Sequence, residues 1–184
     1  MVNLKPLNWN NIETHYRWNN DKELAYYDSD YPHHIEPFES FVQRMKSMNT
    51  KANESVQIFE ITDDLTGELI GVINISGIDK INKKCLLESV IGEKPYRNKG
   101  YGSAAVHMAL DYCFNELEMN KVSSVSFDFN TSWIHVLEKT GFIKEGCLRN
   151  HVIKNDSYCD KIIYSQLATE YQEKMLRDNV SKAV

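Results

Sequence analysis

The residues Tyr96–Ala105, YRNKGYGSAA, combine two cations with two closely spaced glycines. Glycine lets a ligand approach the backbone closely, because it has no side chain. If a helix begins directly after Gly100, its first N–H groups have no carbonyl partner and carry partial positive charge. Arg97 and Lys99 would add direct charge beside them. The stretch therefore predicts a loop that binds a phosphate or pyrophosphate group.

Several known loops share parts of this pattern. A P-loop requires Gly-Lys-Ser/Thr, whereas here Lys99 precedes Gly100. The pattern G-x-G-x-x-A also fits a dinucleotide-binding turn, but such a turn follows its strand almost directly, and here eight residues separate Ile91 from Gly100. The pattern R-x-x-G-x-G fits an acyl-CoA pyrophosphate loop, which the spacing favours. A turn that only caps a helix and binds no ligand remains the alternative interpretation.

The period of the apolar residues predicts the elements that hold this loop. Alternation predicts strands over residues 3–7, 55–62, 69–78, 85–91, 121–129, 142–149 and 158–166. Helical spacing predicts helices over residues 9–19, 37–48, from the loop to about 117, 131–140 and 168–179. Short turns imply antiparallel neighbours, whereas the strand–loop–helix–strand run from Cys85 to Phe129 implies a parallel pair. We predict an α+β fold, with a mixed, mostly antiparallel central sheet, helices on both faces and one βαβ unit, in a single domain over residues 1–184.

Charge and composition exclude several function classes. The net charge of −5 argues against a nucleic-acid partner. The four cysteines form no C-x-x-C pair, and adjacent His33 and His34 diverge in either regular structure, so we expect no metal site. The N-terminus shows no apolar leader, and no apolar run reaches the roughly 18 residues of a membrane helix. We expect a cytoplasmic protein without a membrane partner.

Two spaced motifs carry a family resemblance. The array EKPYRNKGYGSAA, followed by N-x7-E-K-x-G-F over Asn130–Phe142, resembles the GNAT superfamily of acetyl-CoA-dependent N-acetyltransferases. The stretch over residues 136–171 is more specifically similar to the RimJ/RimL-type branch, and Arg17–Asp21 resembles that branch more weakly. The resemblance implies a GNAT-like fold and an enzyme that moves an acetyl group from acetyl-CoA to a primary amine by direct transfer.

The resemblance also implies which residues bind the donor. The strand before the loop binds the pantetheine arm through its backbone at Val90 and Ile91, and a backbone N–H there holds the developing oxyanion. Asn130 matches an asparagine that contacts the cofactor, although Asn is also a favoured helix N-cap and both roles can hold together. The backbone amides that hold the pyrophosphate belong to Arg97, Asn98, Lys99, Gly100, Tyr101, Gly102 and Ser103.

The catalytic acid and base are less well marked. Glu88 is the acidic residue within the strand beside the cofactor, so we predict it as the base, with a solvated strand residue as the other interpretation. The sequence departs from the family where a general acid is expected, because Leu137 stands at the tyrosine position and Trp133 at the serine position. A thiol has a pKa near 8.5, so solvent could protonate the leaving thiolate. Unplaced alternatives are Tyr101, Tyr158 and Tyr164.

The acceptor side is predicted to come from the N-terminal half and the last hairpin. We assign Tyr31 and His33 to it, and Trp133 to its entrance, where buried packing is the other interpretation. The nearby carboxylates of Asp28, Asp30 and Glu36 would suit a cationic amine. An ordinary polar surface loop is the other interpretation of these residues.

Three substrate or function classes follow from the sequence. The branch resemblance favours a protein N-terminal α-amine as the acceptor. A small amine such as a polyamine, amino sugar or antibiotic is the alternative within the enzyme class. A non-catalytic acyl-CoA-binding module is the alternative outside it, because Leu137 and Trp133 replace the familiar acids. The sequence leaves a homodimer open.

Overall fold

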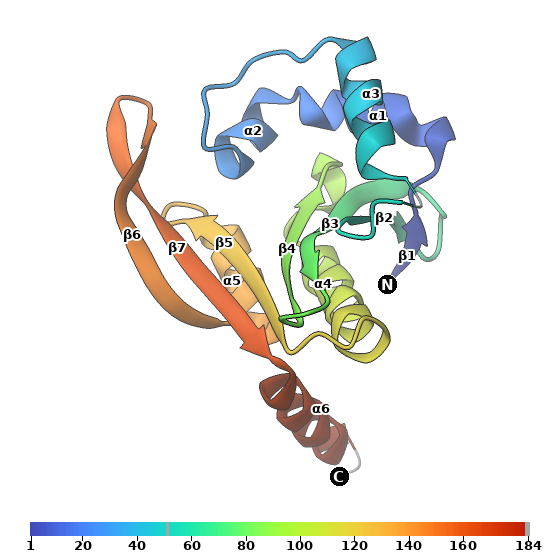
Figure 1. Ribbon diagram of the computed structural model, residues 1–184, viewed down its shortest axis with the longest axis vertical. Coiled ribbons are helices and arrows are strands. Elements are labelled where there is room, and N and C mark those ends of the chain that lie inside the picture. The colour runs from blue at the N-terminus through green and yellow to red at the C-terminus, as the bar shows by residue number, and fades with distance from the viewer. Residues whose placement is uncertain (51, 183–184) are drawn as a thin grey trace.

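A seven-stranded sheet forms the centre of the computed structural model, which describes residues 1–50 and 52–182 (Figure 1). Its strands lie in the order β1-β2-β3-β4-β5-β7-β6. Strands β4 and β5 run parallel, whereas the other neighbouring pairs of the described sheet are antiparallel. This confirms the predicted mixed, mostly antiparallel sheet with one βαβ unit. The strands are β1 (Val2–Pro6), β2 (Gln57–Asp63), β3 (Leu69–Asp79), β4 (Lys84–Ile91), β5 (Lys121–Phe127), β6 (Ile143–Lys154) and β7 (Ser157–Leu167).

Helices cover both faces of the sheet. One face carries α1 (Ile12–Asn19), α2 (Lys22–Asp28) and α3 (Phe38–Met48), and the other carries α4 (Tyr101–Asp111) and α5 (Thr131–Thr140). The sequence did not predict α2. The predicted helix to about residue 117 is confirmed in its extent, although its last part is π-helical. α4 ends at Asp111, a π-helical turn continues it to Glu116, and the Leu117 N–H donates to the Tyr112 carbonyl.

The main core lies between the sheet and α4 and α5. Ile73, Leu87, Leu110 and Leu137 are fully buried there. Because side chains alternate along a strand, Leu87 points into this core and its neighbour Glu88 points to the opposite face, beneath the α1–α3 side. The sheet thus separates the main apolar core from the face that carries Glu88 and a second, smaller apolar cluster around Phe41 and Met45.

A buried polar cluster fixes α1 on the sheet. His15 Nε2 lies 3.0 Å from Glu60 Oε1 of β2, and the other Glu60 oxygen accepts from Asn11 at 2.8 Å. Burial alone would raise the pKa of Glu60, but hydrogen bonds from His15, Asn11 and the backbone N–H of Asn8 outweigh it and hold the pKa below its ordinary value. Glu60 therefore stays ionised and anchors the start of α1.

The end of α1 packs against the end of β4 through a glycine. A Cβ added at Gly92 would lie 2.1 Å from the Trp18 indole, so only glycine admits the ring there. The Trp18 ring nitrogen donates to Glu93 at 3.1 Å, and the Arg17 guanidinium also pairs with Glu93. These contacts place α1, and with it α2, over the carboxyl end of β4.

The parallel strands separate shortly after they meet. β4 and β5 are paired only from Lys84 with Lys121 to Leu86 with Ser123. Beyond that point β4 stays paired with β3 as far as Ile91, while β5 follows β7 as far as Phe127. The two strands therefore diverge, as Figure 1 shows between the arrows labelled β4 and β5, and their facing edges carry backbone groups that pair with no strand of the described sheet.

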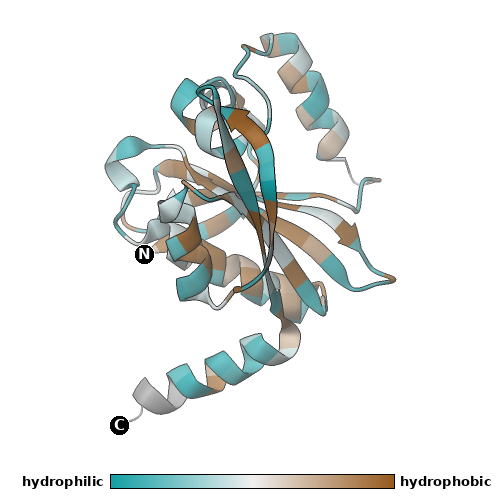
Figure 2. Ribbon diagram, turned by 90° about the vertical axis from the view of Figure 1, so that its left-hand side faces the viewer, coloured by the Kyte–Doolittle hydropathy of each residue, from teal (hydrophilic) through white to brown (hydrophobic). Residues whose placement is uncertain are grey.

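The chain ends in a helix that leaves the body of the protein. α6 (Ala168–Lys182) begins by packing Tyr171 against Phe114 and then projects away with a largely hydrophilic surface (Figure 2). Within the described residues, no helix is long and apolar enough to cross a bilayer.

Candidate active site

The divergence of β4 and β5 opens a groove of about 750 Å³. Residues from α2, β4, the loop over residues 97–103, β5, α5 and β7 line it. The lining includes ten of the residues that the sequence marks for the cofactor, catalysis or the acceptor: Glu88, Val90, Ile91, Arg97, Asn98, Gly100, Gly102, Ser103, Asn130 and Trp133. Segments more than 40 residues apart in the chain are thus gathered on one concave surface.

One end of the groove is the N-terminus of α4. Gly100 precedes the helix in a left-handed conformation with φ +88°, which glycine adopts without steric cost. No side chain caps the first turn, and the backbone N–H groups of a first helical turn lack intrahelical partners. Gly102 has no side chain that could cover these N–H groups. This end has the partial positive charge and the open backbone that a pyrophosphate requires.

Arg97 is used differently from the expectation that it adds charge to the pyrophosphate site. Its Nε donates to the Ile91 carbonyl at 2.9 Å, one terminal nitrogen donates to the Gly92 carbonyl at 2.9 Å, and the other pairs with Glu23 of α2 at 3.0 Å. Its backbone N–H donates to Lys94. Arg97 therefore fastens the end of β4 to α2 and shapes the loop rather than presenting a free cation.

Two other loop residues turn away from the groove. Lys99 is exposed and does not line it. The Tyr101 hydroxyl donates to Asp63 at 2.9 Å, which raises the pKa of Tyr101, and its ring packs edge-on against Tyr96. Tyr101 therefore fixes the start of α4 to the β2–β3 turn, and only its backbone remains available to a ligand.

Asn130 acts as the N-cap of α5. Its side-chain oxygen accepts from the Trp133 N–H at 3.2 Å, which confirms the capping interpretation. Its side-chain nitrogen donates to the Tyr27 carbonyl at 3.3 Å. Asn130 thus joins α5 to α2 across the groove while it also lines the groove.

The other end of the groove is acidic. Glu88 of β4 and Asp28 of α2 both line it. Burial, followed by repulsion from Asp28, raises the pKa of Glu88, whereas Lys161 lowers it. Burial among the groove walls likewise raises the pKa of Asp28 and Lys154 lowers it, although the residue is exposed at the rim of the groove. A half-buried carboxylate with a raised pKa is suited to accept a proton.

Aromatic rings and two lysines surround this acidic end. Phe127 and Phe129 stack with centroids 5.3 Å apart, and Tyr26 packs on Phe129 at 4.9 Å. The Lys154 ammonium lies 5.0 Å from the Phe127 centroid, and Lys161 lies 5.9 Å from it. Aromatic faces beside carboxylates attract organic cations, so this chemistry suits an ammonium group.

The three residues predicted for the acceptor have different positions. Tyr31 is 76% exposed and His33 hydrogen-bonds the Asn20 carbonyl at 3.0 Å; both lie outside the groove lining. Trp133 lines the groove, and its ring nitrogen donates to the Val125 carbonyl of β5 at 3.1 Å. Trp133 therefore covers part of the β5 edge that β4 leaves free.

The positions expected for a general acid hold no acid. Leu137 is fully buried in the core. The unplaced tyrosines are accounted for elsewhere, because Tyr158 is exposed on β7, Tyr164 donates to Glu138, and Tyr101 donates to Asp63. Ser126 also lines the groove, but its buried hydroxyl donates to the Phe127 carbonyl at 3.1 Å.

The sequence reasoning missed Lys161, Phe127 and Phe129 as members of the site. Alternation along residues 121–129 and 158–166 could have placed Phe127 and Lys161 opposite the core. It could not have shown that β7 inserts between β5 and β6, which is the arrangement that brings Lys161 to the groove.

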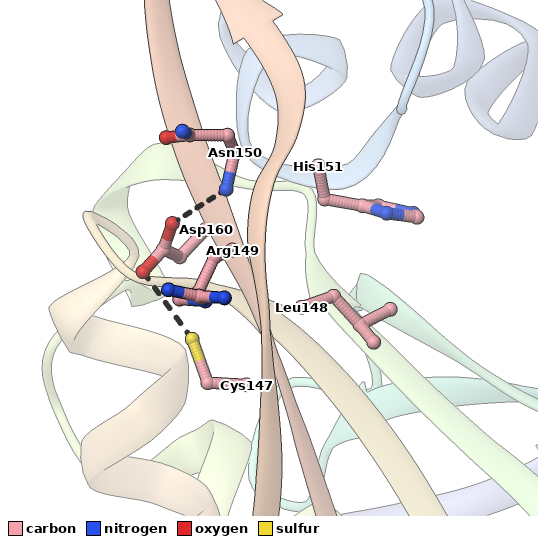
Figure 3. A pocket seen from close by; sticks show the side chains of 6 residues that line it. All are labelled: Cys147, Leu148, Arg149, Asn150, His151 and Asp160. Atoms are coloured by element: carbon pink, nitrogen blue, oxygen red, sulfur yellow. Dashed lines mark hydrogen bonds between the residues drawn. The ribbon is translucent and has the colours of Figure 1, made fainter.

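A second, shallow pocket lies on the β6–β7 hairpin (Figure 3). Asp160 accepts from the Asn150 backbone N–H at 2.8 Å and from the Cys147 thiol at 3.2 Å. The hydrogen bond to Asp160 raises the pKa of Cys147, so the thiol stays protonated and is a poor nucleophile. Asp160 here secures a strand irregularity between Leu148 and Val152, and we assign no reaction to this pocket.

Comparison with known protein families agrees with this geometry. Residues 2–143 match the acetyltransferase (GNAT) domain. The chain belongs to this family. The match includes β4, the glycine loop, β5 and α5, which together form most of the groove, and it confirms the predicted enzyme class at the level of the family.

The relatives of this GNAT chain include a putative ribosomal N-acetyltransferase, spermidine acetyltransferases and several uncharacterised N-acetyltransferases. It is 32% identical over 106 residues to the putative ribosomal N-acetyltransferase YdaF of Bacillus subtilis, an alignment covering 58% of this chain and 57% of that relative. It is 26% identical over 125 residues to spermidine N(1)-acetyltransferase of Vibrio cholerae, covering 68% and 72%. The RimJ/RimL-type branch therefore remains a prediction.

Solved structures confirm the fold. A crystal structure of spermidine N-acetyltransferase from Vibrio cholerae, in complex with CoA and spermine, superimposes with a TM-score of 0.85 at 22% identity, covering 93% of this chain and 98% of that one. A neighbour of the same fold has thus been solved with CoA, which agrees with acetyl-CoA as the predicted donor.

Proposed function

We propose that the protein is an acetyl-CoA-dependent N-acetyltransferase whose acceptor is a small cationic amine of the polyamine type. The observation that carries the proposal is the polarity of the groove: helix N-terminal amides lie at one end, and Glu88 and Asp28 lie at the other. The first end suits a pyrophosphate and the second suits an ammonium. Bound acetyl-CoA would supply the activated acetyl group as a thioester.

The donor would be held mainly by backbone. The first-turn amides of α4, over residues 101–103, would bind the pyrophosphate, and Gly102 would allow its close approach. Beyond Leu86 the edge of β4 that faces β5 pairs with no strand of the described sheet, so backbone groups there, at Val90 and Ile91, would hydrogen-bond the pantetheine arm, apart from the Ile91 carbonyl that accepts from Arg97. A β4 backbone N–H would also donate to the thioester carbonyl oxygen as negative charge develops there.

Glu88 would act as the base. An alkyl ammonium has a pKa near 10.4, so its proton must be removed before nitrogen attacks the thioester carbon. Glu88 would take that proton directly or through one water, nitrogen would form the new C–N bond, and the C–S bond would break to release thiolate. Asp28 would hold a second ammonium of the same acceptor, which favours a diamine or polyamine over a singly charged amine.

The protein N-terminal α-amine is the acceptor that the branch resemblance favours. An α-amine has a pKa near 8 and needs a base far less. The paired carboxylates and aromatic rings are better explained by a multiply charged amine, and the spermidine acetyltransferases among the relatives support this choice. We therefore place the peptide substrate second.

A non-catalytic acyl-CoA-binding module is the function to be excluded by experiment. Initial rates of acetyl-CoA consumption with spermidine, spermine, putrescine and N-terminal peptides, followed by product mass, separate the classes. We expect turnover with a polyamine and at least a hundredfold loss in Glu88→Gln, with CoA binding unchanged by calorimetry. Tight CoA binding without turnover of any amine would contradict the enzyme and support the module.

A further inference from the structure

Lys161 forms part of the groove wall although it lies outside the segment matched by the family, residues 2–143. In the sheet it stands opposite Phe127 of β5, so the two side chains share the face that α2 covers. Its ammonium lies 2.7 and 2.8 Å from the two oxygens of Asp30, and its side chain is only 18% exposed. Because Lys161 contacts both oxygens of Asp30, its ammonium is held in one position.

Glu88 lines the same groove as this cation. It belongs to β4, whereas Lys161 belongs to β7, which follows β5 away from β4. The charged groups that act on Glu88 from the surrounding elements are Asp28 of α2 and Lys161 of β7. Burial and Asp28 both favour the protonated form of Glu88, which cannot accept a proton. Lys161 is the cation that favours the carboxylate.

We propose that Lys161 is a positioning residue that favours the carboxylate form of Glu88 at the acceptor end of the groove. This inference rests on the proposed function, in which Glu88 is the base. The Lys161 ammonium pairs with both oxygens of Asp30, and it acts on Glu88 through space. The acidic end carries the three carboxylates of Asp28, Asp30 and Glu88 against the two ammonium groups of Lys161 and Lys154, which leaves one net negative charge for a cationic acceptor.

Lys154 provides a matched control. It lies on the same aromatic cluster, between the rings of Tyr26 and Phe127, and donates to the Ser29 carbonyl. The groups that act on Lys154 are Asp28, Asp30 and Cys159. Its charge acts on Asp28 and not on Glu88, although its distance from Phe127 is even shorter than that of Lys161.

The sign of the effect follows from the charges. Lys161 lowers the pKa of Glu88, so its removal raises that pKa and leaves less carboxylate at a given pH. Lys161→Gln removes the charge but keeps a side-chain donor for Asp30, so the link between α2 and β7 is preserved. Lys161→Arg keeps the charge. Lys154→Gln removes a neighbouring charge that does not act on Glu88.

The direct test is a ¹³C-carboxyl NMR titration of Glu88 in the protein without CoA. We expect the midpoint to rise in Lys161→Gln, because a charge that favours the carboxylate is lost. The midpoint should stay near that of the wild type in Lys161→Arg and should not rise in Lys154→Gln. Lys161→Met serves as a second neutral variant if the glutamine variant does not fold. An unchanged midpoint in the folded neutral variant would overturn the inference.

The kinetic test separates this inference from the proposed function. The acid limb of the kcat/KM profile for spermidine should move to higher pH in Lys161→Gln by the same amount as the NMR midpoint. A lower rate with an unmoved limb would mean that Lys161 only ties Asp30 to β7, and would overturn the inference while the enzyme assignment stands. A wild-type protein that acetylates no amine would overturn the proposed function, whatever the NMR titration gives.

Discussion

The glycine loop allows stability and donor binding to be separated by two substitutions. Gly100 has φ +88° and a Cβ added there would meet nothing within 4 Å, so Gly100→Ala is penalised only by its backbone conformation. That penalty is about 1–2 kcal/mol. For a chain of this size 1 kcal/mol shifts the Tm by about 2–4 °C, so we expect the Tm to fall by roughly 2–8 °C.

Gly102→Val should leave the Tm nearly unchanged and weaken the binding of acetyl-CoA. A Cβ at Gly102 lies 3.7 Å from a Val136 methyl and 3.8 Å from Ile91, which are ordinary contacts, so the fold accommodates it. The valine methyl groups must then occupy the groove beside the first-turn amides. Losing one amide–phosphate hydrogen bond costs about 1.5–3 kcal/mol. Since 1.4 kcal/mol is tenfold in affinity, acetyl-CoA binding should weaken by at least about tenfold while the Tm changes little.

The assay combines thermal unfolding with calorimetric titration of CoA for the wild type and both variants. The structure predicts a Tm loss for Gly100→Ala and an affinity loss for Gly102→Val. If Gly102→Val binds CoA within twofold of the wild type, the pyrophosphate does not lie on the first turn of α4. If Gly100→Ala keeps the wild-type Tm, the left-handed turn is not required.

Three further predictions concern the packing around the groove. Gly92→Ala should lower the free energy of unfolding by at least about 2 kcal/mol in a urea titration, because its Cβ would overlap the Trp18 ring. Gly146→Ala is the control: its Cβ has open space around it, so its free energy of unfolding should be within about 0.5 kcal/mol of wild type. Glu60→Gln should be destabilising at pH 7. The pKa of Glu60 is lowered by folding, so the carboxylate stabilises the fold above its unfolded pKa, and this stabilisation is lost when the folded state is protonated. The difference in stability from wild type should therefore shrink as the pH falls below about 4.5, and a pH-independent difference would contradict this. Arg97→Met should raise the KM of both acetyl-CoA and the amine in steady-state kinetics, because Arg97 joins the end of β4 to α2; a change confined to acetyl-CoA would mean that it acts only as a phosphate ligand.

Much of the fold follows from local sequence signals. Apolar alternation predicts the strands, and Gly141 marks the end of α5 by adopting the left-handed conformation expected there, with φ +107°. The helix α2 was missed although Asp21 is a good N-cap and accepts from the N–H groups of Glu23 and Leu24. Its seven residues are too few to show a helical period, and its stability comes from packing on the rest of the chain.

The site was predictable where it is built from backbone and less so where it depends on distant partners. The glycine loop and Glu88 lie within one continuous strand–loop–helix segment, so their proximity follows from the sequence. The role of Arg97 in fastening Glu23 depends on α2, and Lys161 meets Asp30 across 131 positions of the chain. Such pairings are set by the order of strands in the sheet, which local periodicity does not encode.

The most direct test of the central claim is a competition between acceptors in one reaction. Equal concentrations of spermidine and an N-terminal peptide are incubated with acetyl-CoA and the wild-type protein, and both products are quantified by mass spectrometry. The acidic, aromatic end of the groove predicts that acetylspermidine exceeds acetylated peptide. An excess of acetylated peptide, or equal amounts of both products, would contradict the assignment of Glu88 and Asp28 to a polyamine-binding site.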